Sequence, residues 1–236
     1  MITLDARLSL AFDLYDSCEL AADIGTDHAH LPAALLQRGR CRHMILTDLS
    51  ESALHNARSK MIRLRLLDRV SLRLGSGLAP LDEPCGMISV TGMGGRTISD
   101  ILLSGKNNLR GASLILSAHT DLPLIRKAVS LIGYHTDREE PCFCSGRYYL
   151  VLRARPGARP VTDMELRLGG PLFDSDSDQL IPWVKRRREV LAAGLTGLLR
   201  ADHPDEAQIA QVQSDIETYD NFILKGRNPH DGNGSV

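Results

Sequence analysis

Short apolar runs alternate with longer amphipathic stretches along the first 155 residues. Runs of about four to eight apolar residues are typical of buried strands, and apolar positions three and four apart indicate helices. We expect strands at Glu19–Ile24, His43–Thr47, Val70–Leu74, Met87–Thr91, Ser113–Ser117, Tyr134–Glu139 and Tyr148–Arg153. We expect helices between them at Ala29–Arg38, Glu51–Leu66, Arg96–Leu103 and Leu122–Ile132. This alternation predicts an α/β fold, a mostly parallel sheet with helices on both faces.

The pattern changes towards the end of the chain. Only a short segment, Cys142–Arg147, separates the last two strands, so they form a hairpin and the final strand is antiparallel. Pro and Gly break the pattern at Arg155–Pro160, and two amphipathic helices follow at Trp183–Leu199 and Pro204–Leu224. We therefore expect a sheet domain at 1–155, a small helical domain at 161–225 and a disordered tail at 226–236.

The composition is that of an ordinary soluble protein. The 236 residues are 43% hydrophobic and have a formal net charge of −1. No apolar stretch approaches the roughly 18 residues of a membrane span, and no basic and apolar leader opens the chain. The five cysteines are scattered, as in proteins of a reducing compartment. We expect a cytoplasmic monomer with no membrane partner.

The charges are unevenly distributed. Residues 161–236 hold 8 Lys and Arg against 13 Asp and Glu, whereas residues 1–160 hold 20 against 16. The mildly basic first part is compatible with a nucleic-acid partner without demanding one.

The tip of the first expected strand carries the first candidate chemistry. Gly25 ends the apolar run, and Asp23 and Asp27 flank it. The dinucleotide fingerprint G-x-G-x-x-G is absent, which disfavours a nicotinamide-dependent oxidoreductase, and the two carboxylates would repel a diphosphate. A cationic nucleoside cofactor such as S-adenosylmethionine suits this loop better. His28 and His30 diverge by roughly 200° on a helix, so we expect no metal site; His28 either caps the helix or contacts a ligand.

The tips of the next strands agree with this interpretation. Asp48 stands where an acidic residue accepts hydrogen bonds from ribose hydroxyls, although it could instead cap the following helix. Gly75–Gly77 and Thr91–Gly95 are glycine-rich loops that leave room for planar ligands, and either could be a plain turn.

Four segments together resemble a known family: Asp23–Pro32 (DIGTDHAHLP), Thr91–Ile98 (TGMGGRTI), Leu114–Arg126 (LILSAHTDLPLIR) and Gly146–Val151 (GRYYLV). They are similar to the bacterial tRNA adenine-N1 methyltransferases that modify position 22 of tRNA, which are Rossmann-like class I enzymes. The resemblance covers nearly the whole chain, including the helical end, which in that family is a small coiled-coil-like domain. It implies S-adenosyl-L-methionine as cofactor and tRNA as partner.

The resemblance also implies roles for individual residues. Asp27 is the catalytic candidate, because a carboxylate stabilises the cationic ring formed when adenine N1 is methylated. The cofactor-binding candidates are Asp23, Gly25, Asp27, His28, Asp48, Leu49, Gly75, Ser76, Gly77, Thr91 and Gly92. The substrate-binding candidates are Met93, Gly94, Gly95, Arg96, His119, Lys185 and Arg186. Further RNA contacts are expected from some of Arg7, Arg126, Lys127, Arg138, Arg147 and the remainder of the cluster Lys185–Arg188, whose alternative is a solvated helix face.

Two positions depart from the family pattern. Ser76 stands where such enzymes often have an acidic residue or Asn, and Ser117-Ala118-His119 replaces Gln-Pro-Asn or Ser-Pro-Gln. These departures keep two alternatives open: a non-catalytic relative that binds S-adenosylmethionine or RNA, and a methyltransferase acting on another acceptor.

Overall fold

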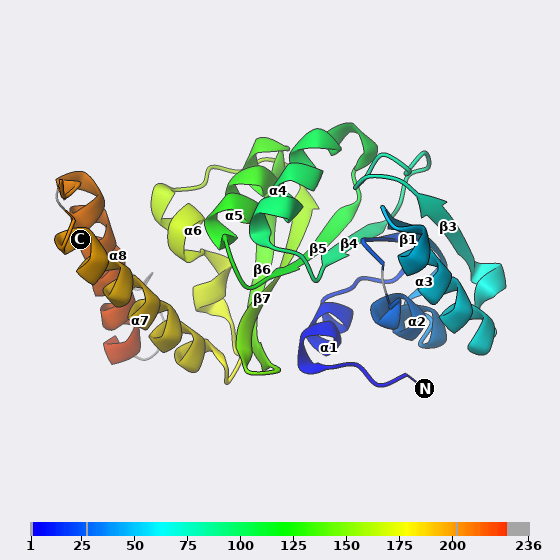
Figure 1. The fold of residues 1–236 in the computed structure, drawn as a ribbon, viewed down its shortest axis with the longest axis horizontal. Helices are drawn as coiled ribbons and strands as arrows, with labels where there is room; N and C mark the ends of the chain where they lie inside the picture. Colours follow the sequence, from blue (N-terminus) through cyan, green and yellow to red (C-terminus); the bar gives the residue numbers. More distant parts are fainter. Residues whose placement is uncertain (1, 27, 202, 226–236) are drawn as a thin grey trace, which may run out of the picture.

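The computed structural model describes residues 2–26, 28–201 and 203–225, and one seven-stranded sheet forms its centre (Figure 1). The strands are β1 Cys18–Ile24, β2 Cys41–Asp48, β3 Val70–Leu74, β4 Met87–Thr91, β5 Ser113–Ala118, β6 Tyr134–Cys144 and β7 Arg147–Pro156. Their order is β3-β2-β1-β4-β5-β7-β6, and β7 runs antiparallel to the other six strands. The predicted fold class is confirmed.

Helices cover both faces of the sheet, because each central strand is apolar on both sides. Ala21 packs in the core under α1 Ala6–Asp13, α2 His30–Gln37 and α3 Glu51–Arg63. Ala22, the next residue of β1, points to the opposite core, which lies under α4 Gly95–Ser104 and α5 Leu122–Leu131. Two short 3₁₀ turns, Leu67–Arg69 and Lys106–Asn108, complete the connections. Helix α1 was absent from the sequence prediction; Asp5 caps it by accepting a hydrogen bond of 2.7 Å from the backbone nitrogen of Leu8.

The predicted hairpin is present but tighter than expected. Strand β6 continues to Cys144 instead of ending at Glu139, and Ser145 and Gly146, both with positive φ, connect it to β7. The hairpin tip lies at the carboxyl edge of the parallel strands, because β6 runs parallel to them.

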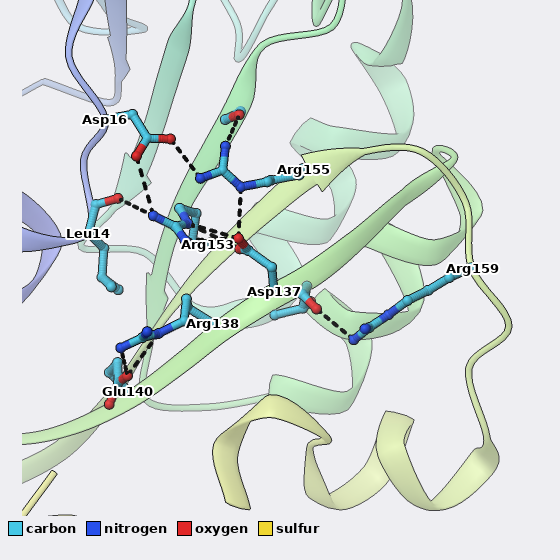
Figure 2. A network of polar contacts seen from close by, with 10 residues as sticks. Leu14, Asp16, Asp137, Arg138, Glu140, Arg153, Arg155 and Arg159 are labelled. Atoms are coloured by element: carbon cyan, nitrogen blue, oxygen red, sulfur yellow. Dashed lines mark hydrogen bonds and ion pairs between the residues drawn. The ribbon is translucent and has the colours of Figure 1, made fainter. Parts of the chain in front are cut away.

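At the opposite, amino edge, the hairpin is tied to the chain before β1 by a charge network (Figure 2). Arg153 donates to both oxygens of Asp137 and to Asp16, and Arg155 donates to Asp137 at 2.7 Å. The carbonyl oxygen of Leu14 also accepts from Arg153. The two arginines lower the pKa of Asp137, although its partial burial acts in the opposite direction.

The C-terminal region is helical, as predicted, and lies at one end of the molecule (Figure 1). It contains α6 Asp163–Leu168, the 3₁₀ turn Pro171–Asp174, α7 Leu180–Leu199 and α8 Glu206–Lys225. Phe173 and Phe222 pack as tilted rings with centres 4.9 Å apart, and both belong to the same core as the inner strands. The division at residue 161 stays a prediction, and the tail 226–236 lies outside the described residues.

One buried ion pair joins the helical region to the sheet. Arg126 on α5 donates to both oxygens of Glu139 on β6, at 2.8 and 2.9 Å, and also to the carbonyl oxygens of Leu166 and Arg167. Arg126 is only 5% exposed. The expectation that Arg126 could contact RNA is therefore wrong, because its guanidinium is buried and already donates to Glu139 and to the two carbonyl oxygens.

Candidate active site at the carboxyl edge

The tips of β1, β2 and β3 are held together by backbone hydrogen bonds. The carbonyl oxygen of Thr47 accepts from the nitrogens of Gly25 and Thr26, at 2.8 and 2.9 Å, and that of Asp48 accepts from Gly75 at 3.0 Å. Gly25 has a φ of +75°, and any Cβ there would collide with the methyl end of Met93. The positive φ favours glycine at this position, and the flexible end of Met93 uses the space beside it.

A first hollow, which we call the Asp48 hollow, opens beside these tips. Its volume is about 370 Å³, within the usual range of roughly 300–1,000 Å³ for small-molecule sites. Its lining comprises Ile24, Gly25, Thr47, Asp48, Leu49, Gly75, Ser76, Gly77, Met93, Thr97, Asp100, Ile101 and Ser104. The structure therefore brings together the predicted residues of three strand tips with Met93.

The Asp48 side chain makes one local contact. Its Oδ1 accepts a hydrogen bond of 2.8 Å from the backbone nitrogen of Ser50. Ser50, not Asp48, caps α3, because its hydroxyl accepts from the nitrogen of Ala53. The helix-capping alternative for Asp48 is wrong, and the carboxylate remains at the wall of the hollow.

A second hollow, the Asp23 hollow, lies on the other side of Gly25. It has a volume of about 240 Å³ and is lined by Arg7, Leu8, Asp23, Gly25, Thr26, His28, Ala29, His30, Leu31, Pro32, Thr91 and Gly92. Gly25 lines both hollows, so they adjoin at this residue, and Met93 lines the first of them. Helix α2 begins after Ala29 with no side-chain cap, so the alternative that His28 caps it is wrong.

Asp23 is buried in the wall of the second hollow. Ser89 donates to its Oδ1 at 2.6 Å and Thr26 to its Oδ2 at 2.5 Å. Burial raises the pKa of this carboxyl from 3.8 to about 6, although both hydrogen bonds and the charge of Arg7 oppose the shift. Asp23 is consequently fixed in orientation and ionised at neutral pH.

Arg7 faces the same hollow. Its guanidinium carbon lies 5.4 Å from the centre of the Tyr149 ring, and its Nη1 is buried without a hydrogen-bond partner among the described residues. Its Nη2 lies 4.0 Å from a carboxylate oxygen of Asp5, at the limit of an ion pair. A buried guanidinium nitrogen without a partner is costly, so this geometry indicates a group that is meant to meet an acceptor.

A third hollow, which we call the hairpin groove, lies further along the same edge. It has a volume of about 320 Å³, and its lining comprises His119, Leu122, Phe143, Gly146, Arg147, Tyr148, Leu150, Trp183, Arg186, Arg187 and Val190. Two substrate candidates, His119 and Arg186, therefore lie together although they are far apart in sequence. Lys185 is exposed and lies outside this lining.

The remaining candidates have other surroundings. Gly94 precedes α4 as its N-terminal cap, and a Cβ on Gly95 would lie 2.7 Å from the carbonyl oxygen of Asp121. Gly95 thus allows α4 to pack against the loop that follows β5. Arg96 is exposed on the first turn of α4. Asp27, the catalytic candidate, lies outside the described residues.

The sequence analysis did not identify several residues that line the Asp48 hollow and the Asp23 hollow. Thr97, Ile101 and Ser104 lie on one face of α4 at the spacing of helical turns, and this face lines the Asp48 hollow. That periodicity was readable from the sequence. The sequence indicates Arg7 only as an RNA contact, because its position beside Gly92 depends on how α1 packs.

The fold and this edge of the sheet agree with a known family. Residues 4–152 match the family model described as a methyltransferase domain. The chain belongs to this family.

Relatives of this methyltransferase domain share more than the sheet. The chain is 29% identical over 160 residues, 67% of each chain, to the Bacillus subtilis (strain 168) tRNA (adenine(22)-N(1))-methyltransferase. Its fold is similar to that of the B. subtilis m1A22 tRNA methyltransferase TrmK, with a TM-score of 0.83 and 23% identity, over 94% of this chain and 100% of that one. The fold is also similar to that of Streptococcus pneumoniae Sp1610 in complex with S-adenosyl-L-methionine, with a TM-score of 0.81 and 24% identity, over 94% of this chain and 100% of that one. The shared fold therefore includes the helical region.

The described residues meet the requirements of neither a metal site with three such ligands nor a membrane-spanning helix. Nowhere in the described part of the chain do three His, Cys, Asp or Glu side chains gather as a metal ion would need. No helix within the described ranges combines the length and hydropathy of a membrane crossing.

Proposed function

We propose that the protein transfers the methyl group of S-adenosyl-L-methionine to N1 of adenine 22 in tRNA. The observation that carries this proposal is the pair of hollows that adjoin at Gly25, one lined by Asp48 and the other by Asp23, in a methyltransferase domain. The similarity to the B. subtilis tRNA (adenine(22)-N(1))-methyltransferase supports the acceptor.

The residues present suit this cofactor. Gly25 and Arg7 both line the Asp23 hollow, and the unpartnered Nη1 of Arg7 can donate to the carboxylate of the amino-acid end. The ionised Asp23 offers a charge for the ammonium group in the same hollow. When bound, the cofactor supplies a sulfonium-activated methyl group.

The other hollow suits the nucleoside end. Asp48 keeps one oxygen in its turn with Ser50 and presents the carboxylate to ribose hydroxyls. Gly75, Ser76 and Gly77 then flank the adenine ring, with Ile101 on α4 as the apolar wall; a Cβ on Gly77 would lie 3.3 Å from Ile101.

The reaction asks little acid–base chemistry of the protein. Adenine N1 has an in-plane lone pair, so it attacks without first losing a proton. The ring becomes cationic, and in this proposal Asp27 stabilises the developing charge. The glycines of the β4 loop, Gly92, Gly94 and Gly95, border the base, and most of the rate comes from aligning N1 with the methyl group. The base must leave its stack in the tRNA to reach this edge.

The deciding experiment is methyl transfer from labelled S-adenosyl-L-methionine to an unmodified tRNA transcript, followed by digestion and mass analysis of the nucleosides. We expect 1-methyladenosine, and its loss when adenine 22 is replaced by guanosine. Label in another nucleoside would identify a different acceptor. Cofactor binding by calorimetry without any transfer would favour the non-catalytic alternative.

A further inference from the structure

The hairpin groove lies where three elements meet: the β6–β7 tip, the loop after β5, and the first half of α7. Arg147, Arg186 and Arg187 contribute three cationic side chains to its wall. Among the described residues, no Asp or Glu lines the groove. Such a surface attracts an anion, in contrast to the acidic walls of the other two hollows.

Aromatic rings form the floor and rim of this groove. Phe143 and Tyr148 lie with ring centres 4.9 Å apart, and Phe143 remains 48% exposed at the hairpin tip. An exposed aromatic ring contributes little to the stability of the fold, because much of its apolar surface stays in contact with water. Exposed aromatic rings beside arginines are the usual platform on which unstacked nucleobases lie.

The arginines of α7 are divided between two uses. Arg188 makes a two-pronged ion pair with Asp220 on α8, at 3.0 and 3.1 Å, and so holds the two helices together. Arg186 makes an ion pair of 3.0 Å with Glu189, one turn away, and both side chains are more than 60% exposed. Such exposed pairs are weak, so Arg186 is available to a phosphate. Arg187 lies 5.8 Å from the Trp183 ring centre, and its Nε is buried without a hydrogen-bond partner among the described residues.

The groove lies beside the proposed active site, across a row of three side chains. His119 lines the groove and its ring also contacts Tyr149, at 5.4 Å between centres. Tyr149 in turn lies 5.4 Å from the guanidinium of Arg7 in the Asp23 hollow. The row His119, Tyr149 and Arg7 therefore forms the ridge between the two cavities.

We propose that the hairpin groove holds an unstacked nucleotide of the tRNA next to the target adenine, with its base on Phe143 and Tyr148 and its phosphates at Arg147 and Arg186. A volume of about 320 Å³ suits one nucleotide and not a duplex. This inference rests on the proposed function and adds the site that holds the flanking strand. In this proposal, the nucleotide beside the flipped target adenine is itself held in place by the groove.

The test measures the affinity of fluorescein-labelled tRNA transcript by anisotropy, over a series of salt concentrations, together with methyl transfer and cofactor affinity. We expect Phe143→Ala to weaken tRNA binding about tenfold with an unchanged salt slope, since it removes a stacking contact. We expect Arg186→Ala to weaken it by a similar factor and to reduce the salt slope by about 1. Both variants keep the cofactor affinity of the parent protein.

Arg200→Ala is the matched control. Arg200 is exposed and lies at the C-terminal end of α7, about 21 Å along the helix from Arg186. It should bind tRNA within twofold of the parent. Phe143 and Arg186 are exposed, so their variants should melt like the parent, and a melting curve checks this.

The two proposals fail in different ways. If the parent protein makes 1-methyladenosine but both groove variants bind tRNA like the parent, the groove proposal is overturned and the function stands; a protein or peptide would then be the occupant to seek. If the parent makes no methylated tRNA yet both variants weaken tRNA binding, the groove stands and the function falls. If the parent does not bind tRNA, both are overturned.

Discussion

The two edges of the central sheet treat their charged side chains in opposite ways. At the amino edge, Arg153 and Arg155 are paired with Asp16 and Asp137, as Figure 2 shows. At the carboxyl edge, Arg7 has a buried nitrogen without a partner among the described residues. The first arrangement holds the chain together, and the second leaves binding capacity for a ligand. Unsatisfied charge, more than charge itself, distinguishes the proposed active edge.

The two carboxyl groups at these edges make the same contrast. Arginines lower the pKa of Asp137, whereas burial raises the pKa of Asp23 to about 6. Ionised Asp137 therefore favours the folded state, and ionised Asp23 disfavours it. The protein tolerates the second situation where, in our proposal, a cation binds.

The largest effect we expect is at Asp27. Asp27→Ala should lower the turnover of methyl transfer by about 100-fold or more, because it removes the charge proposed to face the cationic adenine. Single-turnover kinetics with saturating cofactor and tRNA would measure it. A variant with unchanged turnover and an unchanged melting curve would remove Asp27 from the catalytic machinery.

Arg7→Ala should weaken S-adenosyl-L-methionine binding by about 10- to 100-fold, because a hydrogen bond between charged groups is lost. Calorimetry would measure the affinity. The melting temperature should fall little, since the buried Nη1 has no partner to lose in the described structure. A large loss of stability with unchanged affinity would make Arg7 a structural residue like those of the amino edge.

Arg153→Ala should show the reverse behaviour. Its contacts with Asp137, Asp16 and Leu14 are lost, and we expect a fall of about 1–3 kcal/mol in the free energy of unfolding. Cofactor affinity should stay within twofold. Urea unfolding and calorimetry on the same preparation would separate the two quantities, and weakened cofactor binding would contradict the division between the edges.

Asp23→Asn should change the pH dependence of stability. The folded pKa of Asp23 is raised, so its favourable contribution is fully present below about pH 4 and is lost as the pH rises through about 6. The asparagine variant stays neutral, so its melting temperature relative to that of the parent should rise as the pH increases over this window. Each kcal/mol of unfolding free energy that the parent loses corresponds to about 2–4 °C. Thermal unfolding without cofactor at pH 4.5 and 7 is the measurement. A constant difference would show that Asp23 does not titrate there; Thr26, Ser89 and Arg7 face it and are the same in both proteins.

Much of the fold and part of the site could be predicted from sequence for one reason. In a parallel sheet, residues at successive strand tips must meet at one edge, so Gly25, Asp48 and Gly75 could be placed together. The α6 helix is six residues long and too short for a periodic signal. Arg7 and Arg126 could not be assigned, because the position of each depends on how a helix packs on distant strands.

The position of Phe222 has a consequence for how the protein is made. This ring near the end of α8 packs with Phe173 in the core that includes the inner strands. During synthesis, the sheet is complete once β7 has emerged, yet one side of its core stays open until residue 222 follows. A ribosome that stalls between those points would display an exposed apolar surface, which chaperones and proteases recognise. The protein thus acquires its final stability and completes its helical region in the same late step of translation.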